Sequence, residues 1–114
     1  MNDLAQTSCG TPYFMPPEVC KGEKYGEKAD IWAIGCILYE LAVLWKPFDS
    51  DSIHGVFNLI INQPLDPIPE DVDTDIRMLI ITLLDKNHSK RPTIWDLAKL
   101  PCIQSRINQL VAEQ

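Results

Sequence analysis

The sequence predicts an all-α fold, and three observations lead to this prediction. Apolar residues recur at helical spacing in several segments, prolines and glycines separate those segments, and no segment of any length alternates between apolar and polar residues as a strand does. The chain has 114 residues, of which 46% are hydrophobic, so it can build one small domain with a core but hardly two.

The N-terminal quarter is expected to be mostly irregular. Residues 1–12 are polar and contain Gly10 and Pro12, which is typical of a loop. Residues 16–20 can form one short helical turn, because proline is tolerated at the start of a helix. Residues 21–28 contain two glycines and five charged side chains, and we expect a solvent-exposed connector there.

A long helix is predicted from about Ala29 to Leu44, and Pro47 ends it. Its apolar residues fall on every side of the helical wheel, which predicts a helix buried in the middle of the protein. The apolar stretch of residues 31–45 is too short to cross a bilayer, and Glu40 interrupts it. We therefore expect a core helix and no membrane span.

Two further helices are expected in the middle of the chain. Asp51 or Ser52 can cap a helix over residues 53–60, whose apolar side chains recur at helical spacing. Residues 63–72 contain three prolines and cannot be regular. The clearest amphipathic helix follows, with a single apolar stripe formed by Ile76, Leu79, Ile80, Leu83 and Leu84.

The C-terminal end is expected to hold two short helices. Thr93 and Asp96 have the spacing of a capping box, which predicts a helix from Ile94 to Leu100 that ends at Pro101. Residues 103–111 would form a last and more exposed helix.

Charge and cysteine usage exclude several classes of function. The chain has 10 basic and 16 acidic residues, and a net charge of −6 argues against nucleic acid and against anionic membrane surfaces as partners. Its four cysteines form no CxxC pair and have no histidine at ligand spacing, so no metal site is expected. The N-terminus lacks the features of a signal peptide, and reduced thiols in a cytoplasmic or nuclear protein are the simplest interpretation.

Four short motifs stand out along the chain: CGTPYFMPPE at residues 9–18, DIWAIGC at residues 30–36, PF at residues 47–48 and KRPT at residues 90–93. In this order and at these spacings, they resemble landmarks of the serine/threonine protein kinase catalytic domain, from the end of the activation segment onward. Residues 7–19 and 30–41 are most similar to the NIMA-related kinases. The resemblance implies the helical C-terminal lobe of the kinase fold.

The resemblance implies that the first motif docks the protein substrate. Thr11 would contact the catalytic aspartate and lysine, as it does in serine/threonine rather than tyrosine kinases, and Gly10 with Pro12 leaves its loop few conformations. The pocket for the substrate residue after the phosphorylated one would be lined by Ser8, Cys9, Pro12 and Met15.

The resemblance also makes Thr7 a candidate for the activating phosphate. A phosphate adds close to two negative charges and must be met by arginine, and the arginine that the family uses would lie upstream of this chain. Without the resemblance, Thr7 is a polar residue near the N-terminus with no assigned role.

Other residues have structural roles in the family. Glu18 and Arg91 would form a buried ion pair that joins the activation segment to the last helices, and Asp30 would hold the backbone of the catalytic loop. Ile37 and Leu41 would belong to the core of the buried helix.

Simpler interpretations exist for the same residues. Glu18 and Arg91 could be two surface charges, and Asp30 could be an acid that the helix dipole favours. Met15 and the two aromatic residues before it could be ordinary core.

Some features depart from the family pattern. Pro16 stands where alanine or serine is usual, and Asn87 and His88 replace the usual Asp-Pro pair. The Gly-rich loop, the HRD aspartate and the DFG motif do not occur in the 114 residues. ATP and Mg²⁺ therefore belong to the parent domain. No cofactor is expected on this segment, which should be inactive alone.

These observations divide the chain into residues 1–20, the end of the activation segment with its docking loop, and residues 21–114, a helical core. The first hypothesis is that the chain is part of a serine/threonine kinase. Its partners would then be protein substrates and the upstream half of the domain. The second is a catalytically dead binding module or decoy. A third, a helical domain unrelated to kinases, does not account for four ordered motifs.

Overall fold

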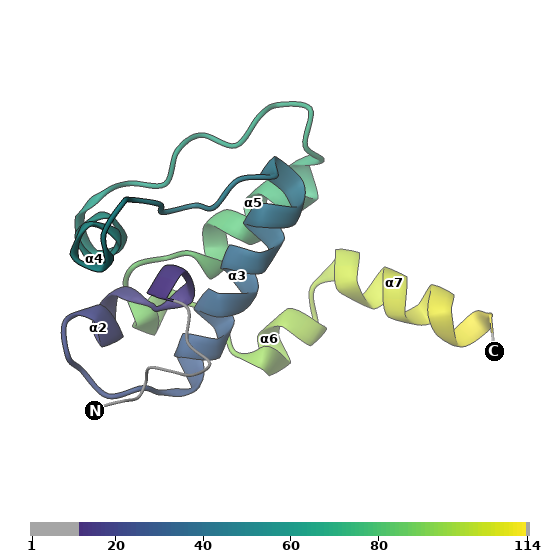
Figure 1. The fold of residues 1–114 in the computed structure, drawn as a ribbon. Helices are drawn as coiled ribbons and strands as arrows, with labels where there is room; N and C mark the ends of the chain where they lie inside the picture. The colour runs from purple at the N-terminus through teal and green to yellow at the C-terminus, as the bar shows by residue number, and fades with distance from the viewer. Residues whose placement is uncertain (1–11, 114) are drawn as a thin grey trace.

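A computed structural model provides the structure, and it describes residues 12–113. The part described is all-α, as the sequence predicts, and contains no strand. The elements follow one another from purple to yellow in Figure 1. They are the 3-10 turn η1 (Pro12–Phe14), α2 (Pro17–Cys20), α3 (Glu27–Val43), α4 (Ile53–Asn62), α5 (Thr74–Leu83), the 3-10 turn η2 (His88–Lys90), α6 (Ile94–Ala98) and α7 (Pro101–Ala112).

Helix α3 is the central element of the fold. It crosses the body next to α5, with α2 and α4 towards one side and α6 and α7 towards the other (Figure 1). The larger core cluster surrounds one side of α3 and consists of Trp32, Cys36, Tyr39, Phe48, Val56, Ile60, Ile68, Ile80 and Leu84. The smaller cluster consists of Ile31, Leu79, Leu83 and Leu97.

Helices α3 and α5 pack closely at Gly35. A Cβ atom placed on Gly35 would lie 2.8 Å from Cβ of Leu83 and 2.8 Å from Cδ2 of Leu84. Both leucines are buried, and atoms that close would overlap. The missing side chain therefore lets the two helices pack at this distance.

Side-chain caps stabilise the starts of α4 and α6. Ser52, rather than Asp51, caps α4, because its Oγ accepts a hydrogen bond from the Gly55 amide at 3.0 Å. The predicted capping box of α6 is present: Thr93 Oγ1 accepts from the Asp96 amide at 3.0 Å, and Asp96 Oδ2 accepts from the Thr93 amide at 2.9 Å.

Two predicted boundaries need correction. Helix α3 ends at Val43 before Pro47 is reached, because Leu44 adopts the left-handed conformation with φ 64° and its amide donates to the Glu40 carbonyl at 2.8 Å. Helix α6 ends at Ala98, and Pro101 is the first residue of α7. A proline is accommodated there because the first amides of a helix have no intrahelical acceptor.

The apolar wheel of α3 by itself predicts burial on every side, but one side is exposed in the described part of the chain, as expected for a helix whose partners in a kinase domain include upstream segments. Ile37 is 46% exposed and Leu41 is 70% exposed, and this stripe continues through Leu44 and Trp45 at the end of the helix. The wheel of α3 is apolar all round, yet the elements in the described part of the chain cover only its other sides. We call Ile37, Leu41, Leu44 and Trp45 the open face of α3.

Across residues 12–113, no helix combines the length and the hydrophobicity that a membrane span requires.

Candidate functional site

The predicted docking residues fall partly inside the structure. Thr7, Ser8, Cys9, Gly10 and Thr11 lie outside the described residues. The described part begins with the segment from Pro12 to Met15, which turns through η1 and is closed by a hydrogen bond of 3.3 Å from the Met15 amide to the Pro12 carbonyl. We refer to this stretch as the docking segment.

The docking segment rests on the helical body through aromatic and sulfur contacts. Tyr13 and Phe14 are half-buried and pack against the larger core cluster, and the ammonium of Lys46 lies 4.9 Å from the centre of the Tyr13 ring. Two thiols make weak hydrogen bonds to its backbone carbonyls, from Cys36 to Tyr13 at 4.0 Å and from Cys20 to Met15 at 3.8 Å. Sequence reasoning gave these two cysteines no role.

Glu18 and Arg91 form a bidentate ion pair that joins α2, next to the docking segment in the sequence, to the loop that carries Arg91. Arg91 Nη2 donates to Glu18 Oε1 at 2.7 Å, and Arg91 Nη1 donates to Glu18 Oε2 at 2.9 Å. Glu18 is 7% exposed and Arg91 is 2% exposed, so the pair is shielded from water. The alternative of two surface charges does not fit this geometry. Parallel hydrogen bonds from a planar guanidinium to a carboxylate are the strongest form of such a pair.

The folded chain positions Glu18 by a proline turn. Pro16 has an extended backbone, Pro17 begins α2, and both rings are buried. Glu18 follows in the first turn of α2, where the positive end of the helix dipole stabilises a carboxylate. The second proline of the PPE sequence therefore starts the helix that carries the anchoring carboxylate.

Arg91 does more than pair with Glu18. Its Nε donates to the Asp85 carbonyl at 2.7 Å, and its Nη1 donates to the Lys28 carbonyl at 3.0 Å. The Nζ of Lys28 donates a hydrogen bond of 2.8 Å to the Arg91 carbonyl. The Arg91 guanidinium lies 5.0 Å from the centre of the Trp32 ring. Arg91 thus joins the start of α3 and the loop after α5 to α2, the helix that follows the docking segment.

The electrostatic balance at Glu18 favours the charged form. Burial by itself would raise the pKa of Glu18, but the hydrogen bonds and the positive charge of Arg91 outweigh it, so the pKa lies below the ordinary value of 4.5. Glu18 is therefore ionised at neutral pH, and the pair persists as a salt bridge.

A second, half-buried cation lies beside this pair. Lys86 Nζ donates to the Ile60 carbonyl at 2.5 Å and lies 4.4 Å from the centre of the Phe48 ring. Phe48 stacks on Trp32 with 5.9 Å between the ring centres. Burial lowers the pKa of Lys86 to about 8. Lys86 therefore links the end of α4 to the aromatic pair at the centre of the fold, a role that nothing in the sequence pattern indicated.

Asp30, the candidate anchor for a catalytic loop, is exposed in the first turn of α3. Its Oδ1 accepts a hydrogen bond from the Tyr25 hydroxyl. The side chain is therefore held in place on the surface at the start of the open face. No group of three or more potential metal-ligating side chains occurs within residues 12–113.

Comparison with known proteins identifies related sequences. The family model for the protein kinase domain matches residues 1–103. The chain is 38% identical over 105 residues to the serine/threonine-protein kinase Nek5 of Mus musculus, covering 92% of this chain and 17% of that protein. It is 34% identical over 112 residues to Nek1 of Mus musculus, covering 98% and 9%. It is 37% identical over 105 residues to Nek8 of Danio rerio, covering 91% and 15%. The chain therefore spans less than a fifth of the length of these relatives.

Proposed function

The chain belongs to the protein kinase family and is similar to the NIMA-related kinases, and from this premise we propose that it supplies the substrate-docking part of a serine/threonine kinase. Residues 1–20 would form the end of the activation segment and its docking loop. Residues 21–114 would form the helical core that supports them. The parent reaction would be transfer of the ATP γ-phosphoryl group to a serine or threonine hydroxyl of a protein.

The observation that supports this proposal most strongly is the buried pair of Glu18 and Arg91. A surface that binds a peptide must hold its backbone in one conformation, since a loop that orders only on binding loses affinity to that ordering. The pair fixes the turn that directly follows Pro12 and Met15, two of the proposed docking residues. Ser8, Cys9, Gly10 and Thr11 would complete the docking surface, and Thr7 would carry the activating phosphate.

A chimera tests the docking role. The upstream part of the Nek5 catalytic domain, joined in register to these 114 residues, should phosphorylate a peptide library. Met15→Ala should then change the preference for the residue after the phosphorylated one, whereas Ile81→Ala, an exposed change on α5, should leave that preference unaltered. Phosphorylation with an unchanged preference in Met15→Ala would contradict the docking assignment. An inactive chimera that still binds the substrate peptides would favour the decoy function instead.

The 114 residues alone should not bind ATP. They contain no Gly-rich loop, no HRD aspartate and no DFG motif, so ATP and Mg²⁺ would be held by other parts of the parent domain. Calorimetry with Mg-ATP should give no heat of binding, and no phosphate should be transferred to a peptide. Saturable, Mg²⁺-dependent binding of ATP would contradict this prediction.

The open face of α3 should make the isolated chain associate or bind hydrophobic dyes. In the parent domain, we propose, catalytic-loop and upstream segments cover this face, and Asp30 holds that loop. Leu41→Glu should reduce dye fluorescence and association, because it places a charge among Ile37, Leu44 and Trp45. Ile53→Glu is the matched control, since Ile53 is 58% exposed on α4, away from this face. A dye-negative monomer with a sharp thermal transition would count against the proposal.

The proposed partners are protein substrates and the upstream half of the domain, and the proposed location is the cytoplasm or the nucleus. Free thiols at Cys20, Cys36 and Cys102 in the described residues support a reducing compartment.

A further inference from the structure

A cavity of about 300 Å³ lies between α5 and the junction of α6 with α7. Its walls are mainly apolar and come from Met78, Leu79, Pro92, Leu100 and Pro101. None of its lining residues belongs to the docking segment or to the Glu18–Arg91 pair. It is therefore a separate feature of the molecule, and the docking function proposed above leaves it unused.

The chain builds this cavity from two prolines and two helix starts. Pro92 precedes the capping box of α6, Pro101 begins α7, and both rings line the cavity. Leu79 is buried and forms part of the smaller core cluster, whereas Met78, its neighbour on α5, is 58% exposed at the opening. An apolar hollow with an exposed methionine at its edge suits a side chain from another molecule.

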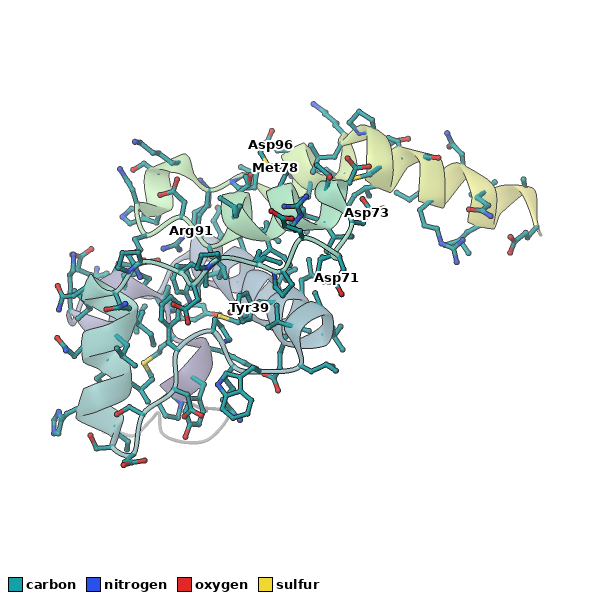
Figure 2. The ribbon with its side chains drawn as sticks, turned by 90° about the horizontal axis from the view of Figure 1, so that it is seen from above. Tyr39, Asp71, Asp73, Met78, Arg91 and Asp96 are labelled. Carbon is teal, nitrogen blue, oxygen red and sulfur yellow. The ribbon has the colours of Figure 1, made fainter. Side chains whose placement is uncertain are left out.

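Two carboxylates give the cavity its charge. Asp75 lines it from the first turn of α5, and Asp96 lines it from the first turn of α6. Met78 and Asp96 are labelled close together in Figure 2 and line the same cavity. The hydrogen bonds of the capping box hold the Asp96 carboxylate in place and lower its pKa, so it carries its charge at neutral pH.

Among residues 12–113, no lysine or arginine lines the cavity to neutralise these carboxylates. Lys99 and Lys28 lie close enough to contribute to the lowered pKa of Asp96, but neither is part of the wall. The Lys28 ammonium is already bonded to the Arg91 and His88 carbonyls. The cavity therefore combines an apolar interior with two negative charges that no cation of its own wall balances.

We propose that this cavity docks a peptide segment of a partner protein in which a bulky aliphatic residue stands next to an arginine or a lysine. The aliphatic side chain would fill the hollow against Leu79 and Pro92, and the cation would lie between Asp75 and Asp96. A volume of about 300 Å³ is at the lower end of the range for small-molecule pockets, which favours one or two side chains over a larger ligand. The partner is thus recognised on the side of the helical core away from the docking segment.

Methionine methyl groups give a direct test on the whole chain. The chain has three methionines, Met1, Met15 and Met78, so ¹³C-methyl labelling gives a simple spectrum in which Met78 reports on the cavity and Met15 on the docking segment. The probes are acetyl-Gly-Leu-Arg-Gly-amide and the same peptide with citrulline or glutamate in place of arginine. The arginine peptide should shift the Met78 signal saturably and leave the Met15 signal in place. The citrulline peptide should bind at least about threefold more weakly, which is the effect of one exposed ion pair, and the glutamate peptide more weakly still.

Two matched variants distinguish an effect of the cavity's charge on binding from an effect on folding. Asp75→Asn should remove most of the preference for arginine over citrulline, whereas Asp71→Asn, an exposed acid outside the lining, should keep it. Asp75 is exposed, so its replacement leaves the core intact. Equal binding of the arginine and citrulline peptides, an unmoved Met78 signal, or an unaltered preference in Asp75→Asn would each overturn the proposal. Because these readouts need no phosphotransfer, they are independent of the docking function proposed above.

Discussion

Replacing Arg91 by alanine is expected to lower the free energy of unfolding by about 3–5 kcal/mol, because it leaves the Glu18 carboxylate buried without its partner. Glu18 is 7% exposed and both of its oxygens accept hydrogen bonds from Arg91. Glu18→Ala should cost a similar amount. Arg91 would retain its bonds to the Asp85 and Lys28 carbonyls, so part of its stabilising role would survive.

The double mutant decides whether the two charges act as a pair. Removing both should cost much less than the sum of the single changes, because no unpaired charge then remains in the interior. Urea unfolding of the four proteins gives the coupling energy. Small and additive losses, each below about 1 kcal/mol, would mean that the pair behaves as an exposed one.

The same pair should make stability depend on pH. The pKa of Glu18 is lower in the folded chain than in the unfolded chain, so its contribution is present above the ordinary value of 4.5 and is lost as the pH falls through the folded value. Between these values the unfolded state binds more protons, and wild-type stability should therefore fall on acidification. The double mutant lacks this contribution and should show a shallower decline.

Gly35→Ala is expected to destabilise the fold by about 1–3 kcal/mol, although alanine is the better helix former. Alanine gains about 1 kcal/mol of helix propensity over glycine inside α3. The new methyl group, however, would lie 2.8 Å from Cβ of Leu83 and 2.8 Å from Cδ2 of Leu84, and Cβ of Leu83 can give way only if the backbone of α5 moves. The overlap forces α3 and α5 apart and disturbs both core clusters.

Gly26→Ala is the matched control for this prediction. A Cβ atom on Gly26 meets nothing within 4 Å, and its backbone has an ordinary extended conformation at the start of α3. Its thermal midpoint should stay close to that of the wild type while that of Gly35→Ala falls. Leu84→Ala should cost less in the Gly35→Ala background than in the wild type, because it then removes one of the two overlaps as well as a buried side chain. Equal stability of both glycine variants would show that α3 and α5 can separate freely.

Local signals in the sequence predicted most of the fold. The capping box at Thr93, the prolines of residues 63–72 and the apolar stripe of α5 each act within a few residues, and the structure agrees with all three. The burial of helix α3 was harder to predict. Its helical wheel is apolar on every side, so it does not indicate which sides other segments cover. Its open face could not be predicted from periodicity.

The candidate site depends on contacts between distant segments. Only the resemblance to protein kinases paired Glu18 with Arg91, since nothing local relates two residues 73 positions apart. The aromatic and carbonyl contacts of Lys86 and the bonds of the Cys20 and Cys36 thiols had no signal at all in the sequence. Apart from the bond between Cys20 and Met15, these contacts join residues far apart in the sequence.

The distance along the chain between Glu18 and Arg91 also has a consequence for how the protein is made. Closing a loop of 73 residues costs conformational entropy, and a contact this remote forms only after the intervening helices have assembled. During synthesis the docking segment leaves the ribosome before Arg91, whose side chain anchors the turn that follows this segment. The surface proposed to recognise substrates therefore acquires its fixed shape only after Arg91 has emerged.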